Sequence, residues 1–197
     1  MQKTGFLWLG HADYLGADTA ALQQQAAADA AALPLMQAET GPIATTDAQA
    51  IQAVRVLVEE KQLCGVVLVL TSWVECSVVM TALKELRGRP CMLWGCPAQG
   101  AQGGTGSYVS AAMFSGVIQR LKLPCPILIA EPGSEKARRT LAAFSAAAAA
   151  MDMLFYAKIG LFGYTSMSIY TGTFDHVLMR HKIGPEIDQM DTYSLIR

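Results

Sequence analysis

The sequence lacks any apolar run long enough to cross a membrane. Hydrophobic residues make up 52% of its 197 residues, but no uninterrupted run approaches the roughly 18 to 20 residues that a membrane-spanning helix needs. The first ten residues also lack the core and the cleavage site of a signal peptide, because Gly10 ends the first apolar stretch after four residues. We therefore expect a soluble, cytoplasmic protein that does not bind membranes.

Basic clusters and paired cysteines are scarce as well. The formal net charge is −1, and the cluster of Lys136, Arg138 and Arg139 has no aromatic or basic stripe beside it that would follow a phosphate backbone. None of the five cysteines forms a CxxC pair, and most lie in or beside apolar segments, where a thiol behaves as a small hydrophobe. These absences argue against a nucleic-acid partner and predict reduced thiols.

What the sequence does contain is an alternation of short apolar segments with helix-sized stretches. Residues 66–70 are apolar at every position, so we expect this strand to be covered on both faces, as in parallel sheets flanked by helices. Right-handed crossovers favour a strand order near 2-1-3-4-5. The predicted fold class is α/β, a doubly wound, flavodoxin-like sheet of five parallel strands at residues 5–10, 34–38, 64–70, 91–95 and 126–130.

Two helices carry signals of their own. Residues 47–62 open with Thr46 and Asp47 as candidate caps and repeat apolar residues along one face of a 3.6-residue period. Residues 134–156 follow a Pro132-Gly133 turn and include five consecutive alanines, which form helix strongly and permit close packing. We expect this second segment to be a connecting helix.

The pattern restarts after residue 156 with a strand at 158–164, a helix near 173–182 and a strand at 185–191. Some 40 residues cannot bury enough surface to offset their ordering entropy. We therefore predict a first domain at 1–156 and, at 157–197, only the opening β-α-β of a second α/β domain, whose apolar surface favours self-association.

Ligands of open α/β sheets bind beyond the carboxyl ends of the strands, so the loops after the five strands are the candidate sites. The glycine-rich loop 100–106 opens a helix, but no Lys-Ser/Thr follows it and it comes after the fourth strand, so we interpret it as a tight turn rather than a phosphate loop. Cys76 is a candidate nucleophile at a helix start, although most such cysteines are inert.

The loops after the first and third strands hold the remaining candidates. His11, Asp13 and Glu75 are candidate metal ligands that no spacing rule joins. Trp73 has two interpretations that the residues alone leave open. It is either a packing residue at a strand end or a flat wall against which the apolar face of a sugar stacks.

The succession TSWVEC, LWG, GGTGS, EPGS, IGLFGY and YTGTFDHVLMRHKIGPEIDQMD resembles the amino-terminal part of the L-fucose isomerase-like family, which is related to the arabinose isomerases. The similarity covers essentially the whole chain, and GYTSMSIYTGTFD is its most specific part. The resemblance implies a metal-dependent aldose–ketose isomerase, usually with Mn²⁺, of three domains. This chain would hold the first domain and the opening of the second, while the metal ligands would lie beyond Arg197.

The same resemblance assigns roles to residues and partners. A tryptophan after the third strand of these isomerases contacts the sugar bound at a neighbouring subunit, and Trp73 matches it. With the loop residues His11, Tyr14 and Glu75 it forms the predicted substrate-binding set of a homo-oligomer that acts on a small sugar. Related enzymes carry arginine or glutamine on the first loop, so the identity of the sugar is open. The alternative is a stand-alone sugar- or anion-binding regulatory module without catalysis.

Overall fold

The computed structural model describes residues 3–37, 39–60, 62–97, 105–163 and 174–196. The chain divides into two compact units, Met1–Ala149 and Ala150–Arg197, and the boundary falls inside the long helix α5 (Glu135–Tyr156).

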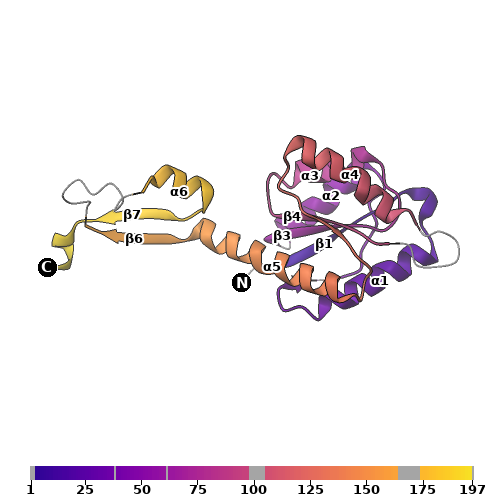
Figure 1. Cartoon of the computed structure of the whole chain (residues 1–197), viewed down its shortest axis with the longest axis horizontal. Helices are drawn as coiled ribbons and strands as arrows, with labels where there is room; N and C mark the ends of the chain where they lie inside the picture. Colours follow the sequence, from indigo (N-terminus) through magenta and orange to yellow (C-terminus); the bar gives the residue numbers. More distant parts are fainter. Residues whose placement is uncertain (1–2, 38, 61, 98–104, 164–173, 197) are drawn as a thin grey trace. The chain divides into compact units, whose positions relative to one another are not determined.

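The first unit is built on a five-stranded, all-parallel sheet in the order β2-β1-β3-β4-β5 (Figure 1). This confirms the predicted fold class and strand order. The central pair β1–β3 is in register from Thr4–Gly65 to Leu9–Leu70. The strands are β1 (Thr4–Leu9), β2 (Met36–Gln37), β3 (Gly65–Leu70), β4 (Cys91–Gly95) and β5 (Ile127–Ile129).

Helices cover both faces of this sheet (Figure 1). On one face lie α2 (Asp47–Arg55), α3 (Cys76–Glu85) and α4 (Ser107–Leu121), which pack on a core that contains Leu68 and Phe114. On the other lie α1 (Ala17–Ala31) and the part of α5 within this unit, over a core that contains Trp8, Trp94 and Leu141. Every residue of β3 is buried, because a parallel strand in the middle of such a sheet contacts helices on both sides.

The predicted helix signals act as expected. The hydroxyl of Thr46 accepts the Gln49 N–H at 3.3 Å and caps α2, and the chain leaves α2 through a π-helical turn at Val56–Glu60. The alanine-rich end of α5 approaches the sheet closely, since a Cβ at Gly65 would lie 2.8 Å from the Cβ of Ala148. Small side chains on both elements are what permit this approach.

The second unit contains β6 (Lys158–Phe162), α6 (His176–Lys182) and β7 (Glu186–Met190), with the two strands parallel and in register. In its described part only Gly184 and Pro185 are buried. The expected apolar surface is present on β6, where Ile159 is 45% exposed and Phe162 is 48% exposed.

Candidate functional site

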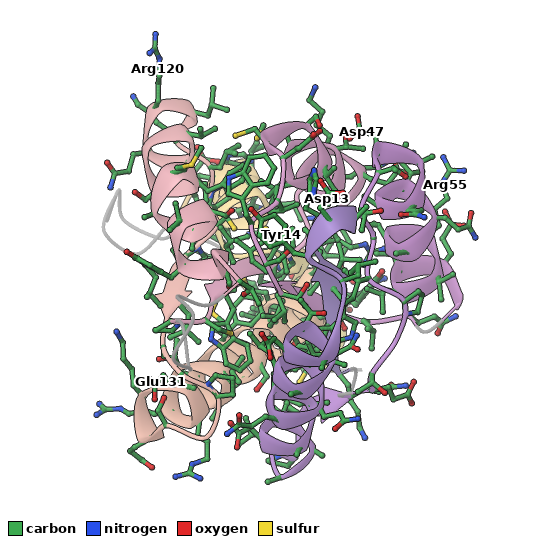
Figure 2. The ribbon with its side chains drawn as sticks, turned by 90° about the vertical axis from the view of Figure 1, so that its right-hand side faces the viewer. Asp13, Tyr14, Asp47, Arg55, Arg120 and Glu131 are labelled. Atoms are coloured by element: carbon green, nitrogen blue, oxygen red, sulfur yellow. The ribbon has the colours of Figure 1, made fainter. Side chains whose placement is uncertain are left out.

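The candidate site lies beyond the carboxyl ends of β1 and β3, which are neighbouring inner strands of the sheet. The helices that follow them, α1 and α3, cover opposite faces of the sheet, so their connecting loops diverge (Figure 1). Such a divergence is the topological switch point at which doubly wound proteins bind ligands. Asp13 and Tyr14 lie near the middle of the face that Figure 2 shows, between α4 and α2.

The loop after β1 fixes the imidazole of His11. This residue caps a single 3₁₀ turn, Ala12–Tyr14, because its Nδ1 accepts the Asp13 N–H at 3.2 Å and its carbonyl accepts the Tyr14 N–H at 3.0 Å. In a neutral imidazole whose Nδ1 accepts a hydrogen bond, the proton lies on Nε2. The turn therefore presents Nε2–H as a donor next to the exposed ring of Tyr14.

Two buried hydroxyl residues join this loop to the loop after β3. Thr71 donates through both its N–H and its hydroxyl to the Leu9 carbonyl, at 2.8 and 2.9 Å. The His11 N–H donates to the Ser72 hydroxyl at 3.0 Å, and that hydroxyl donates to the Trp73 carbonyl at 2.8 Å. Because Thr71 and Ser72 are fully buried, these bonds hold the two loops in a fixed relation.

The start of α4 supports Trp73 from the other side. The Trp73 N–H donates to the Thr105 carbonyl at 2.6 Å, and the Val74 N–H donates to the Ser110 hydroxyl at 3.0 Å. Gly106 has a φ of +76°, and a Cβ there would lie 3.1 Å from the Cβ of Trp73. Glycine is therefore required at this position both by the backbone conformation and by the close contact.

The His11 ring contacts two other rings of the site. The centroids of His11 and Trp73 are 5.2 Å apart at 60°, and those of His11 and Tyr14 are 5.9 Å apart at 74°. Tyr14 is 48% exposed, whereas Trp73 and His11 are half-buried. The cluster therefore combines apolar ring surface with open access to solvent.

Two carboxylates flank the imidazole on opposite sides. Glu75 Oε1 lies 3.9 Å from His11 Nε2, and Asp13 Oδ2 lies 3.7 Å from Nδ1. Both carboxylates are largely exposed, so solvent and salt screen their charge. The structure thus brings together all four predicted substrate-binding residues, with an acceptor on Glu75, a donor on His11 and ring surface on Trp73 and Tyr14. Asp13 adds a second carboxylate beside them.

A metal does not fit these residues well. Asp13 and Glu75 approach different nitrogens of His11, and Nδ1 already accepts a backbone hydrogen bond. Within the described ranges, no group of three or more His, Cys, Asp or Glu side chains is placed to hold a metal ion. Manganese in a larger enzyme stays a prediction that rests on the resemblance.

The other sequence candidates contribute less. Cys76 is exposed at the first position of α3. Cys96, behind the site, is buried, and burial raises the pKa of its thiol to about 12, so it stays protonated and unreactive at neutral pH. Most of the glycine-rich loop 100–106 lies outside the described residues.

Sequence reasoning missed the residues that support the site. Ser107, at the start of α4, donates to the Leu70 carbonyl at the end of β3 and accepts the Cys96 N–H at 2.8 Å. Small hydroxyl residues directly after an apolar strand, as in Thr71-Ser72, and at the first turn of the following helix are a signal that could have indicated such ties.

The fold and this cluster define a doubly wound α/β protein with an aromatic, partly acidic site at its switch point. No protein-family model matches the chain, and no curated protein matches it either. The kinship with sugar isomerases therefore stays a prediction from the quoted motifs. In the described part of the chain, no helix combines the length and the apolar character needed to span a bilayer.

Proposed function

We propose that the chain is the amino-terminal part of a metal-dependent aldose–ketose isomerase of the L-fucose or L-arabinose type. In this proposal it supplies a sugar-binding wall and a subunit-contact surface, while the ligands of the manganese ion lie outside this chain. The observation that carries the proposal is the half-buried Trp73 ring beside His11 at the β1/β3 switch point.

The chemistry of a sugar explains why this cluster suits it. A pyranose or open-chain sugar has a C–H face that stacks on an aromatic ring and hydroxyls that both donate and accept hydrogen bonds. Trp73 offers the ring, His11 Nε2–H donates, and the Glu75 carboxylate accepts. Because Glu75 Oε1 lies 3.9 Å from that nitrogen, one monosaccharide can reach all three groups.

Each residue then has a binding role rather than a chemical one. Trp73 orients the sugar ring by stacking, His11 and Glu75 select hydroxyl positions, and Tyr14 extends the wall toward solvent. These groups would face a sugar held by a neighbouring subunit, so the working enzyme would be a homo-oligomer. The purified chain alone should bind sugar weakly and should not isomerise it.

The second candidate is a stand-alone sugar-binding module. It is favoured by the fact that all four residues, from His11 to Glu75, lie in the first unit, so the site needs no other domain. An anion is a poorer ligand than a sugar for this module, because two carboxylates flank the only imidazole in the cluster. Reading the gene past codon 197 for a catalytic domain separates this candidate from the first.

An NMR titration of the whole chain tests the binding role. L-fucose and L-arabinose at up to about 50 mM, well above a millimolar Kd, should cause saturable shifts at the amides of His11 and Trp73. The variant His11→Phe keeps a ring but loses the Nε2–H donor, and we expect at least about fivefold weaker binding. His181→Phe, on exposed α6, is the matched control and should leave binding unchanged.

Two results would contradict the proposal. If no aldose or ketose tested causes saturable shifts, the proposed sugar-binding role of Trp73 and His11 is wrong. Measurable aldose–ketose turnover by the purified 197-residue chain would show that the catalytic groups lie within it, contrary to the assignment made above.

A further inference from the structure

A separate hollow of about 300 Å³ lies along the outer edge of β1. It is lined by residues 6–8 of β1, by the segment 39–44, and by one side of α2 and the turn that follows it. None of the four residues of the candidate site lines it. A volume of this size is at the lower end of small-molecule sites.

The hollow exists because the chain leaves β1 and returns to it. The strand β2 pairs only with Thr4 and Gly5, and the chain comes back to the sheet at Ala44, whose N–H donates to the Trp8 carbonyl at 2.9 Å. Between these points the segment 39–43 bulges away from the middle of β1.

Hydrogen bonds from both sides fix this bulge. The Trp8 indole N–H donates to the Glu39 carbonyl at 3.0 Å, and the Gln23 side-chain amide, from the buried side of α1, donates to the Gly41 carbonyl at 2.6 Å. The wall is therefore built from anchored backbone, and the hollow is preformed rather than opened by a ligand.

The lining is strongly apolar and holds no basic residue. Phe6 and Trp8 are its aromatic members, although only 5% and 3% of their respective surfaces are exposed, and Ile43, Val56 and Leu57 are aliphatic members. The side-chain oxygen of Gln49, one of the few polar groups, already accepts from both the N–H and the hydroxyl of Thr45 at 2.8 and 3.0 Å. Glu39, Thr40 and Gln52 are the other polar lining residues. A sugar would exchange its hydration for few polar partners here, and an anion would find no basic one, which is costly.

From this lining we infer that the hollow binds a small, uncharged aromatic compound of about two fused rings. An apolar cavity of about 150 Å³ accommodates one benzene ring, so twice that volume suits two. Aromatic pairs prefer offset or edge-to-face contacts, and Phe6 and Trp8 already meet edge to face with centroids 5.2 Å apart. This inference is independent of the proposed sugar site.

Indole is a suitable probe, and methyl-labelled full-length chain provides the readout. We expect saturable shifts at the methyl groups of Ile43, Val56 and Leu57 upon indole titration. Methyls of Ile159 and Leu178, which lie on exposed surface of the second unit, serve as an internal control for non-specific apolar binding and should show no saturation.

Filling the hollow should remove the binding. Ala53→Trp places an indole inside the hollow, and we expect indole affinity to fall at least about tenfold. Ala48→Trp, an exposed position on the same helix outside the lining, is the matched control and should bind as the unmodified chain does. Should Ala53→Trp fail to fold by circular dichroism, Val56→Phe provides the same test with a smaller increase in volume.

Three outcomes would overturn the inference. These are no saturable shifts at Ile43, Val56 and Leu57 up to the solubility of indole, equal shifts at Ile159, or unchanged indole binding in a folded hollow-filling variant.

Discussion

The strands β3 and β6 are both parallel strands, yet one is buried at all of its positions and the other is largely exposed. The sheet of the first unit has helices on both faces, so β3 contacts side chains above and below it. The second unit has a two-stranded sheet and, in its described part, one helix between its strands. The two strands differ both in helix cover and in composition, since β3 is GVVLVL and β6 is KIGLF, and a parallel strand is buried throughout only where both faces of its sheet are covered.

The two units also differ in how their polar groups are satisfied. In the first unit, buried hydroxyls of Thr71 and Ser107 bond to carbonyls at strand ends. In the second, Arg180 donates to the Phe155 carbonyl at 2.8 Å and lies 3.7 Å from Glu186, with both charged side chains well exposed. Exposed ion pairs contribute little to stability, so we expect the second unit to be the weaker one.

Hydrogen exchange should show the largest contrast. Amides of Gly65–Leu70 should exchange only upon global unfolding, which typically requires 5 to 15 kcal/mol, whereas those of Lys158–Phe162 should exchange through local opening. We expect a difference in protection of at least about a thousandfold. Native-state exchange followed by NMR measures this difference. Similar protection in both strands would show that the two units do not differ in stability as expected.

The same side-chain truncation made in each unit should give unequal losses of stability. Leu68 is fully buried in β3, so Leu68→Ala should cost about 2 to 5 kcal/mol. Leu178 in α6 is 51% exposed, so Leu178→Ala should cost less than about 1 kcal/mol. Denaturant unfolding followed by circular dichroism compares the two variants, and equal losses would argue against a core confined to the first unit.

A smaller effect should separate two serines of α4. Ser107→Ala removes the hydroxyl that bonds the Leu70 carbonyl and the Cys96 N–H, two buried groups. We expect this to lower the free energy of unfolding by about 1 to 3 kcal/mol. Ser115→Ala loses a hydroxyl that bonds the Ala112 carbonyl of its own helix, and should change stability by less than about 0.5 kcal/mol. Thermal unfolding of both variants tests this, with indistinguishable midpoints as the contrary result.

The fold class and most strands of the first unit could be predicted from the pattern of apolar residues. The apolar runs 66–70 and 91–95 are short, continuous and separated by helical patterns, an alternation that is typical of a parallel sheet covered by helices on both faces. The prediction was less accurate for the second strand. The sequence predicts a strand at 34–38. Residue 38 lies outside the described residues, and among the others only Met36–Gln37 pair with β1 before the chain returns to it at Ala44.

The sequence predicts which loops hold the candidate site but not the contacts between their residues. The switch-point rule selects the loops that hold His11 and Trp73. It cannot reveal that the His11 N–H bonds to Ser72, 61 residues away, or that the rings of His11 and Trp73 meet. Such contacts depend on the register of β1 against β3, which periodicity does not specify.

The variant Trp73→Ala distinguishes a binding wall from a packing residue at this position. The measurement is the Kd for L-fucose or L-arabinose in the folded variant, with its unfolding midpoint as the control. For a binding wall we expect at least about tenfold weaker binding and a stability loss below about 2 kcal/mol, since Trp73 is half-buried. A loss of about 3 to 5 kcal/mol, as for a fully buried tryptophan, with unchanged sugar binding would contradict it.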